Sequence, residues 1–270
     1  MIPGAGMHII VCIKQVPETS NVQMDERTGT MLREGVESII NPLDLYAVEL
    51  ALQLKEAHGG RAIVLSMGPP RADKAIREAI SMGADGGVLL SHRALAGSDT
   101  YATSLALAKA VARLRPFDLI LAGVRATDGE TGQVGPGVAS LLRLPLSTYT
   151  SRILAMTDGK ITVERLVETG YETLCLPLPC LLTVGKEIGY PRLPTLRGKQ
   201  KAREQQVPVW GPAELGIEED MVGSAGSPTR VVRIARPQIA RKGQRVETAR
   251  LGATRAAKEF ADFLEEHDLL

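Results

Sequence analysis

Short apolar runs alternate with longer segments of helical periodicity from the start of the chain to about Leu144. The apolar runs predict buried β-strands over 8–14, 61–66, 86–90 and 117–121. The segments that follow them predict helices over 42–58, 71–82, 99–114 and 138–142. In the first helix, apolar residues recur three or four positions apart from Leu43 to Leu54, and Gly59 supplies the stop. This alternation predicts a parallel sheet with helices on both faces.

The pattern changes after Pro145, where strand-like segments follow one another without helices. Residues 148–155, 160–168 and 171–184 predict antiparallel strands, with a hairpin turn at Asp158-Gly159. Residues 22–33 predict a short hairpin-like excursion. The fold class that we expect is therefore α/β: a doubly wound, mostly parallel sheet with helices on both faces and a few antiparallel strands.

From Gly185 onward the chain loses its periodicity. Residues 191–199 are irregular and basic, and a helical pattern returns only over 248–266. A long irregular segment cannot build a core of its own, so it predicts an extended C-terminal arm that lies on a partner subunit.

Composition narrows the class of protein. Of 270 residues, 44% are hydrophobic, enough for one large domain with an appendage. The net charge of +1 argues against a nucleic-acid or membrane-surface role. Three cysteines without paired spacing make a disulfide framework or a metal site unexpected. We see no signal-peptide pattern and no apolar run of the roughly 20 residues that cross a bilayer, so we expect a cytoplasmic protein without membrane insertion.

The run from Ala122 to Gly137 is the strongest functional signal. It follows a strand and leads into a helix, so free backbone N–H groups and a positive helix end meet at one point, which suits a phosphate group. Its last glycines, Gly132, Gly135 and Gly137, run Gly-x-x-Gly-x-Gly, the reverse of the dinucleotide fingerprint, and the chain has no Gly-Lys-Ser/Thr phosphate loop. The run therefore predicts a nucleotide site of a different type.

Other turns are expected at the same edge of the sheet. Cys12 and Lys14 close the first strand, Asn41 opens the first long helix, and Met67 follows the second strand. Such turns meet at the carboxyl ends of the strands in a doubly wound sheet. Asn41, followed by a proline, could also be an ordinary N-cap that needs no ligand.

Residues 96–104 form a second hydroxyl-rich turn. Ser98 or Asp99 would cap the helix, and Thr100, Thr103 and Ser104 would present hydroxyls suited to a diphosphate. The alternative is a well-capped helix whose threonines are merely exposed. In the glycine-rich run, a cap for the following helix or a contact to a ribose hydroxyl explains Asp128 better than acid–base catalysis, and we assign no catalytic side chain.

The chain resembles the beta subunit of electron transfer flavoprotein over nearly its whole length. The resemblance rests on the motifs Val11–Pro17, Asn41-Pro42, Ser66–Pro69, Ala79–Asp85 and Asp128–Pro136. It extends through a signature region from Val163 to Thr183, in which Thr169 departs from the usual acidic residue or glycine.

The resemblance implies a heterodimer with an alpha subunit that carries a redox-shuttling FAD. In one branch of the family the beta subunit binds structural AMP. In the electron-bifurcating branch it binds a second FAD, which takes a hydride from NADH and sends one electron to a high-potential acceptor through the alpha FAD and one to ferredoxin or flavodoxin. The 96–104 turn resembles the bifurcating branch, so we expect FAD here, with AMP as the alternative. A standalone adenine-nucleotide-binding module, of another class, would leave the segment after Gly185 unexplained.

The resemblance also implies which residues form the site. The expected cofactor-binding residues are Cys12, Asn41, Asp44, Met67, Asp99, Thr100, Thr103, Gly123, Asp128, Thr131, Gln133, Val134, Gly135 and Pro136. Main chain near Cys12 and Met67 would face the adenine, and 133–136 the phosphates. A loop centred on Leu196, with Arg192, resembles the segment that recognises an acyl-CoA-type or other dehydrogenase. We accordingly expect residues 1–190 to form the nucleotide-binding domain, and 191–270 the recognition loop and an arm that packs on the alpha subunit.

Overall fold

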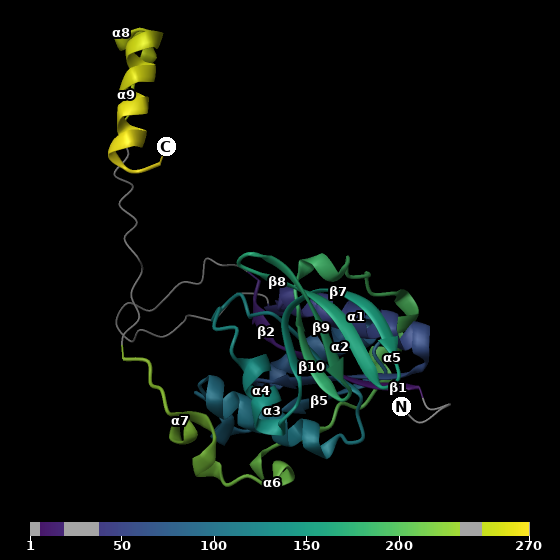
Figure 1. Cartoon of the computed structure of the whole chain (residues 1–270). Coiled ribbons are helices and arrows are strands. Elements are labelled where there is room, and N and C mark those ends of the chain that lie inside the picture. The colour runs from purple at the N-terminus through teal and green to yellow at the C-terminus, as the bar shows by residue number, and fades with distance from the viewer. Residues whose placement is uncertain (1–5, 19–37, 233–244, 270) are drawn as a thin grey trace. The chain divides into compact units, whose positions relative to one another are not determined.

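The computed structural model of the chain describes residues 6–18, 38–232 and 245–269 (Figure 1). The chain divides into two units, Met1–Val232 and Arg233–Leu270. The hairpin-like excursion expected over 22–33 lies outside the described residues.

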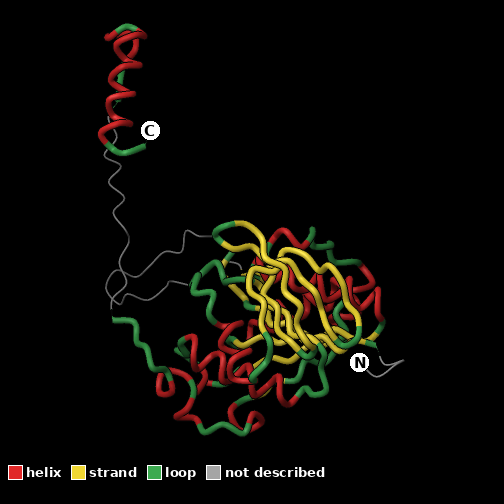
Figure 2. Tube along the Cα trace, viewed as in Figure 1, coloured by secondary structure: helices red, strands yellow, loops and turns green. Residues whose placement is uncertain are grey.

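The first unit is built on a nine-stranded sheet, seen as the continuous set of strands in Figure 2. In spatial order its strands are β11 (Val209–Trp210), β5 (Gly86–Leu90), β4 (Gly60–Met67), β1 (Met7–Ile13), β6 (Leu119–Gly123), β10 (Cys180–Val184), β7 (Leu146–Thr157), β8 (Lys160–Val167) and β9 (Gly170–Pro177). Neighbours from β11 to β7 pair in parallel, whereas β7, β8 and β9 pair antiparallel. Two short strands, β2 (Gln15–Pro17) and β3 (Ser38–Ile40), pair antiparallel beside it. The predicted α/β sheet with a few antiparallel strands is confirmed.

Helices cover both faces of this sheet. On one face lie α1 (Pro42–His58), α2 (Asp73–Met82) and α5 (Leu196–Glu204). On the other lie α3 (Thr100–Arg113), α4 (Val134–Leu142) and α6 (Pro212–Leu215). Short turns of 3₁₀ helix (Pro70–Ala72, Arg93–Leu95, Lys186–Ile188 and Glu219–Met221) and α7 (Gly223–Gly226) complete the unit. Strands buried between two helical layers must be apolar at every position, which explains their continuous apolar runs.

Two predictions of secondary structure in the first unit were wrong. Residues 171–184 are not one antiparallel strand, because the run divides at Leu178-Pro179 into β9 and β10, and β10 inserts in parallel between β6 and β7. All five residues of β10 are buried, as expected of a central parallel strand. Residues 191–199 are not wholly irregular, since α5 begins at Leu196, with the Thr195 side chain accepting a hydrogen bond from Gly198 N.

The second unit contains α8 (Thr248–Leu251) and α9 (Ala253–Glu266). The single helix expected over 248–266 is divided at Gly252, whose φ of +76° interrupts the helical backbone. Ala256 is buried within this unit, whereas Phe260 keeps 58% of its surface exposed. None of the helices described has the length and apolar character needed to cross a membrane.

Candidate functional site

The fourteen candidate cofactor-binding residues gather at the carboxyl edge of the parallel strands. Cys12 lies near the end of β1, and Met67 and Gly123 end β4 and β6. Asn41 and Asp44 lie at the start of α1, and Asp99, Thr100 and Thr103 at the start of α3. The remaining candidates lie in the loop after β6 and the first turn of α4: Asp128, Thr131, Gln133, Val134, Gly135 and Pro136. This edge is where doubly wound sheets bind ligands.

The N-termini of α3 and α4 lie side by side at this edge (Figure 1). The Ser104 Oγ is 3.3 Å from the Val134 carbonyl oxygen, and a Cβ on Gly137 would lie 2.4 Å from that Oγ. Ser104 does not present its hydroxyl as expected: it is buried and donates to the Thr100 carbonyl oxygen at 2.6 Å. Its role is to pack the two helices closely. Two helix N-termini then direct positive dipole ends to one region.

The glycine-rich loop enters α4 through residues with unusual backbone conformations. Glu130 and Gly132 have φ of +51° and +62°. The Gly137 amide donates to the Gln133 carbonyl oxygen at 2.9 Å, as an intrahelical bond. The amides of Val134 and Gly135 precede it, and the first N–H groups of a helix have no intrahelical acceptor. They remain as donors for an anion.

Asn41 occupies the N-cap position of α1, with Pro42 after it, but its side chain forms no capping hydrogen bond. Instead, its Nδ2 donates to the Arg125 carbonyl oxygen at 2.9 Å, and its Oδ1 accepts from the Thr127 amide at 3.1 Å. Asn41 is fully buried. The reading of Asn41 as an ordinary N-cap is therefore wrong, since the side chain fastens the glycine-rich loop to the start of α1.

Asp44 joins the ends of two strands. Its Oδ2 accepts from the Lys14 amide at 2.7 Å and its Oδ1 from the Gly123 amide at 3.2 Å. Burial raises the pKa of Asp44 to about 7, although hydrogen bonds from Asn41 and from these two amides oppose the rise. Burial and the Asp44 carboxylate raise the pKa of the Cys12 thiol to about 12, so Cys12 stays protonated and is not a nucleophile.

Asp128 pairs with Lys14 across the same edge, with Nζ to Oδ1 at 2.7 Å. Gln133 holds the N-cap position of α4, so Asp128 does not cap that helix. The sequence indicated both residues of this pair but not that they meet, because 114 residues separate them.

Asp99 caps α3 as expected, accepting from the Ala102 amide at 3.0 Å. Its other oxygen accepts from the amide and the Oγ1 of Thr229, at 2.9 and 2.8 Å. The Asp99 amide donates to the Ser227 Oγ at 2.8 Å, and the Ser98 Oγ accepts from the Gly223 amide at 3.0 Å. The segment Gly223–Thr229 thus covers this turn, a relation that no local sequence signal predicts.

These features fit an adenine nucleotide. The helix starts and loop amides supply donors for phosphates, Thr100, Thr103 and Thr131 supply hydroxyls, and half-buried Cys12 and Met67 supply an apolar wall. Gly135 packs against Thr183, where a Cβ would lie 2.6 Å from the threonine Cγ2, so the main chain of the α4 start can lie against β10.

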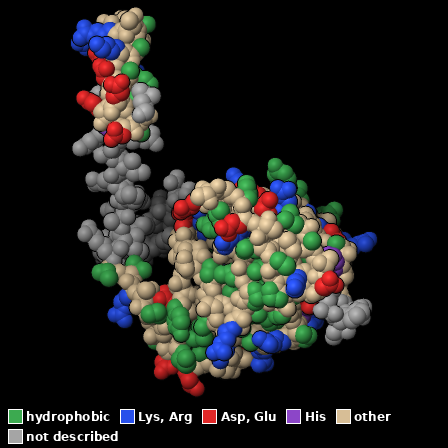
Figure 3. Space-filling view, viewed as in Figure 1, with side chains coloured by type: hydrophobic (Ala, Val, Ile, Leu, Met, Phe, Trp, Pro, Cys, Tyr) green, Lys and Arg blue, Asp and Glu red, His purple; other side chains and the backbone are tan. Residues whose placement is uncertain are grey.

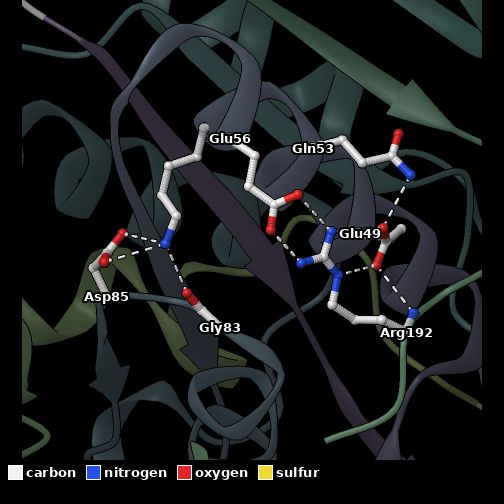
Figure 4. Close-up of polar contacts among 7 residues, drawn as sticks. Glu49, Gln53, Glu56, Gly83, Asp85 and Arg192 are labelled. Atoms are coloured by element: carbon white, nitrogen blue, oxygen red, sulfur yellow. Dashed lines mark hydrogen bonds and ion pairs between the residues drawn. The ribbon is translucent and has the colours of Figure 1, made fainter. Parts of the chain in front are cut away.

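Arg192 is bound by its own chain, through two glutamates of α1 (Figure 4). Its guanidinium makes a two-nitrogen contact with Glu49, at 2.9 and 3.0 Å, and a second with Glu56. The Arg192 amide also donates to Glu49, at 3.0 Å. The segment that follows is thereby held on α1, while Leu193 and Leu196 stay 84% and 87% exposed.

Fold and site together define a nucleotide-binding α/β protein, and comparison with known proteins names its family. The electron transfer flavoprotein domain family matches residues 28–215. Subunit CarD of the caffeyl-CoA reductase-Etf complex of Acetobacterium woodii is 44% identical over 241 residues, covering 89% of this chain and 92% of that protein. An electron transfer flavoprotein subunit beta of Thermoanaerobacterium thermosaccharolyticum is 44% identical over 239 residues, covering 88% and 91%.

Protein FixA of Azotobacter vinelandii is 43% identical over 238 residues, covering 86% of this chain and 85% of that protein. The chain belongs to the electron transfer flavoprotein beta-subunit family.

Proposed function

We propose that this chain is the FAD-binding subunit of an electron-bifurcating flavoprotein heterodimer. When bound, FAD would supply the redox chemistry: it would accept a hydride from NADH, and the electrons would pass to a high-potential acceptor by way of the alpha-subunit FAD and to a low-potential ferredoxin or flavodoxin. The protein's part is to bind and orient this cofactor and to tune it electrostatically. The observation that carries the proposal is the meeting of two helix N-termini and a glycine-rich loop at one sheet edge, in a chain of this family.

The fourteen residues named above would hold the cofactor. The amides of 133–135 and the start of α3 would face the diphosphate, and Cys12 and Met67 the adenine. AMP is the second candidate, and a beta subunit that held it would serve a non-bifurcating carrier. The hydroxyls at the start of α3, next to α4, favour FAD, because a diphosphate and a ribityl chain need more donors than one phosphate does.

We further propose that residues 1–190 form the nucleotide-binding domain, that residues 191–270 form the recognition loop and an arm on the alpha subunit, and that β7–β9 of the first segment also face that subunit. The antiparallel strands β7–β9 expose Leu154, Leu166 and Tyr171. Hydrophobic side chains are visible on this side of the first unit in Figure 3, and exposed apolar groups of this kind suit the alpha subunit. The apolar side chains of α9 would also pack on that subunit. CarD's name places it in a caffeyl-CoA reductase-Etf complex, so we infer an acyl-CoA-type dehydrogenase partner for the segment around Leu196.

The test is to co-express the chain with its alpha subunit and to count the nucleotides that co-purify. Two FAD per heterodimer, with both flavins bleached by NADH, would support the proposal. One FAD with one AMP would reject the bifurcating version and leave the AMP-type carrier. A stable, ATP-binding monomer of the chain alone would reject both.

A further inference from the structure

The start of α1 meets the nucleotide edge in an unusual way, through buried polar side chains rather than exposed ones. Asn41 is fully buried and Asp44 is 6% exposed. Together they form four hydrogen bonds with main-chain groups outside their own helix: those of Lys14, Gly123, Arg125 and Thr127. Buried polar groups with main-chain partners fix the backbone that they contact.

These contacts leave the two side chains few means of touching a ligand. Each Asp44 oxygen already accepts a main-chain hydrogen bond, and both polar atoms of Asn41 are paired. The Asp44 side chain also packs closely against the end of β6, because a Cβ on Gly123 would lie 2.4 Å from the Asp44 Oδ1. The groups that they hold are the ends of β1 and β6 and the first residues of the glycine-rich loop.

We infer that Asn41 and Asp44 are positioning residues, which shape the nucleotide loop through the main chain and do not contact the nucleotide. The inference rests on the proposed nucleotide site and assigns a different role to two residues that the family resemblance placed among the cofactor ligands. Ionised Asp44 accepts more strongly from the two amides than protonated Asp44 does, because protonation turns one oxygen into an O–H donor and weakens it as an acceptor.

The charged and titratable groups around Asp44 are few among the residues described. The Cys12 thiol faces it from β1, and the Lys14 side chain, which is paired with Asp128, lies beyond the strand end. Burial places the pKa of Asp44 at about 7. Wild-type Asp44 therefore approaches the neutral state of an asparagine as the pH falls below neutrality.

The experiment measures the dissociation constants of FAD and AMP for the nucleotide-stripped heterodimer, with wild-type chain or Asp44→Asn. We expect the variant to bind about tenfold more weakly at about pH 8.5, since one amide loses its acceptor. We expect this ratio to shrink toward one at about pH 5.5, where wild-type Asp44 is itself neutral. The ligand's own titration cancels in the ratio. A constant ratio, or equal affinities at both pH values, would overturn the inference.

Two further variants separate positioning from general destabilisation. Asp85→Asn also removes a carboxylate that accepts from a strand amide, that of Ala62 at 2.8 Å, but it lies before β5, at the opposite edge of the sheet. It should lower stability and leave nucleotide affinity unchanged. Asn41→Ser, which keeps a capping residue but loses the loop contacts, should weaken binding at both pH values, since those contacts to Arg125 and Thr127 do not titrate. If the wild-type complex bound neither nucleotide, the proposed function would fail instead.

Discussion

Thr229 donates two hydrogen bonds to the Asp99 carboxylate, from its amide at 2.9 Å and from its Oγ1 at 2.8 Å, across 130 residues of sequence. Asp99 also caps α3, so Thr229 fastens the last residues of the first unit to the start of a helix at the nucleotide edge. Burial alone would raise the pKa of Asp99, but the hydrogen bonds from Ala102 and Thr229 outweigh it and hold that pKa below its usual value.

Thr229→Val should lower the free energy of unfolding by about 1–2 kcal/mol, because one charge-assisted hydrogen bond is lost while the shape is kept. Urea denaturation of the purified complex measures this. Thr173→Val is the matched control, since Thr173 is exposed on β9, and it should change stability by less than about 0.5 kcal/mol. Equal effects of the two substitutions would show that the Thr229 hydroxyl contributes nothing.

Arg192→Lys should destabilise the chain by about 3 kcal/mol, because a lysine cannot reproduce the forked contacts with Glu49 and Glu56, and the Glu49 side chain is only 6% exposed. Arg152→Lys is the control. Its partner is Glu164, and the Arg152 side chain is 69% exposed, so the loss there should be small.

The Arg192 contact also predicts a pH dependence. Burial raises the pKa of Glu49, but hydrogen bonds from Arg192 outweigh that and hold the pKa below its ordinary value of 4.5. A carboxyl with a lowered pKa stabilises the fold above its unfolded value and loses that contribution as the pH falls through the folded value. The stability difference between wild type and Arg192→Lys should therefore be full above pH 4.5 and shrink below it. Thermal melts of both proteins over this pH range measure the stability difference. A difference that grew as the pH fell would contradict the prediction.

The sequence predicted local structure well where the signals were local. The α1 bounds, Pro42 to His58, match the prediction because Pro42 and Gly59 mark both ends. The division between β9 and β10 was missed although Pro177 and Pro179 interrupt the run locally, whereas no local signal shows that β10 pairs in parallel between β6 and β7. The partners of Asn41, Lys14 and Asp99 were missed for another reason: each lies more than 80 residues away and meets its partner only when the sheet assembles.

Leu196→Glu should abolish electron exchange with the dehydrogenase partner and leave folding intact. Leu196 is 87% exposed at the start of α5, so a charge there costs the free protein less than about 0.5 kcal/mol of stability. When the dehydrogenase docks, the same charge would be buried in an apolar contact. Met221→Glu, at an apolar residue 50% exposed elsewhere in the unit, is the control and should transfer electrons normally. Activity assays and melting curves of both variants decide between docking and a structural role.

Gly123→Ala should both destabilise the chain and weaken nucleotide binding. An added Cβ would lie 2.4 Å from the Asp44 Oδ1 and 2.8 Å from the Leu43 carbonyl carbon, and main chain cannot move aside as a flexible side chain can. Overpacking of this kind costs about 1–3 kcal/mol. The β6 end and the start of α1 would separate, and the loop that follows Gly123 would shift with them.

Gly129→Ala, in the same loop, is the matched control, because nothing lies within 4 Å of its added Cβ. It should leave stability and affinity within about 0.5 kcal/mol of wild type, since surface substitutions away from special features have effects of that size. If Gly123→Ala bound FAD or AMP as tightly as Gly129→Ala does, close packing at the β6 end would not be what shapes the nucleotide loop.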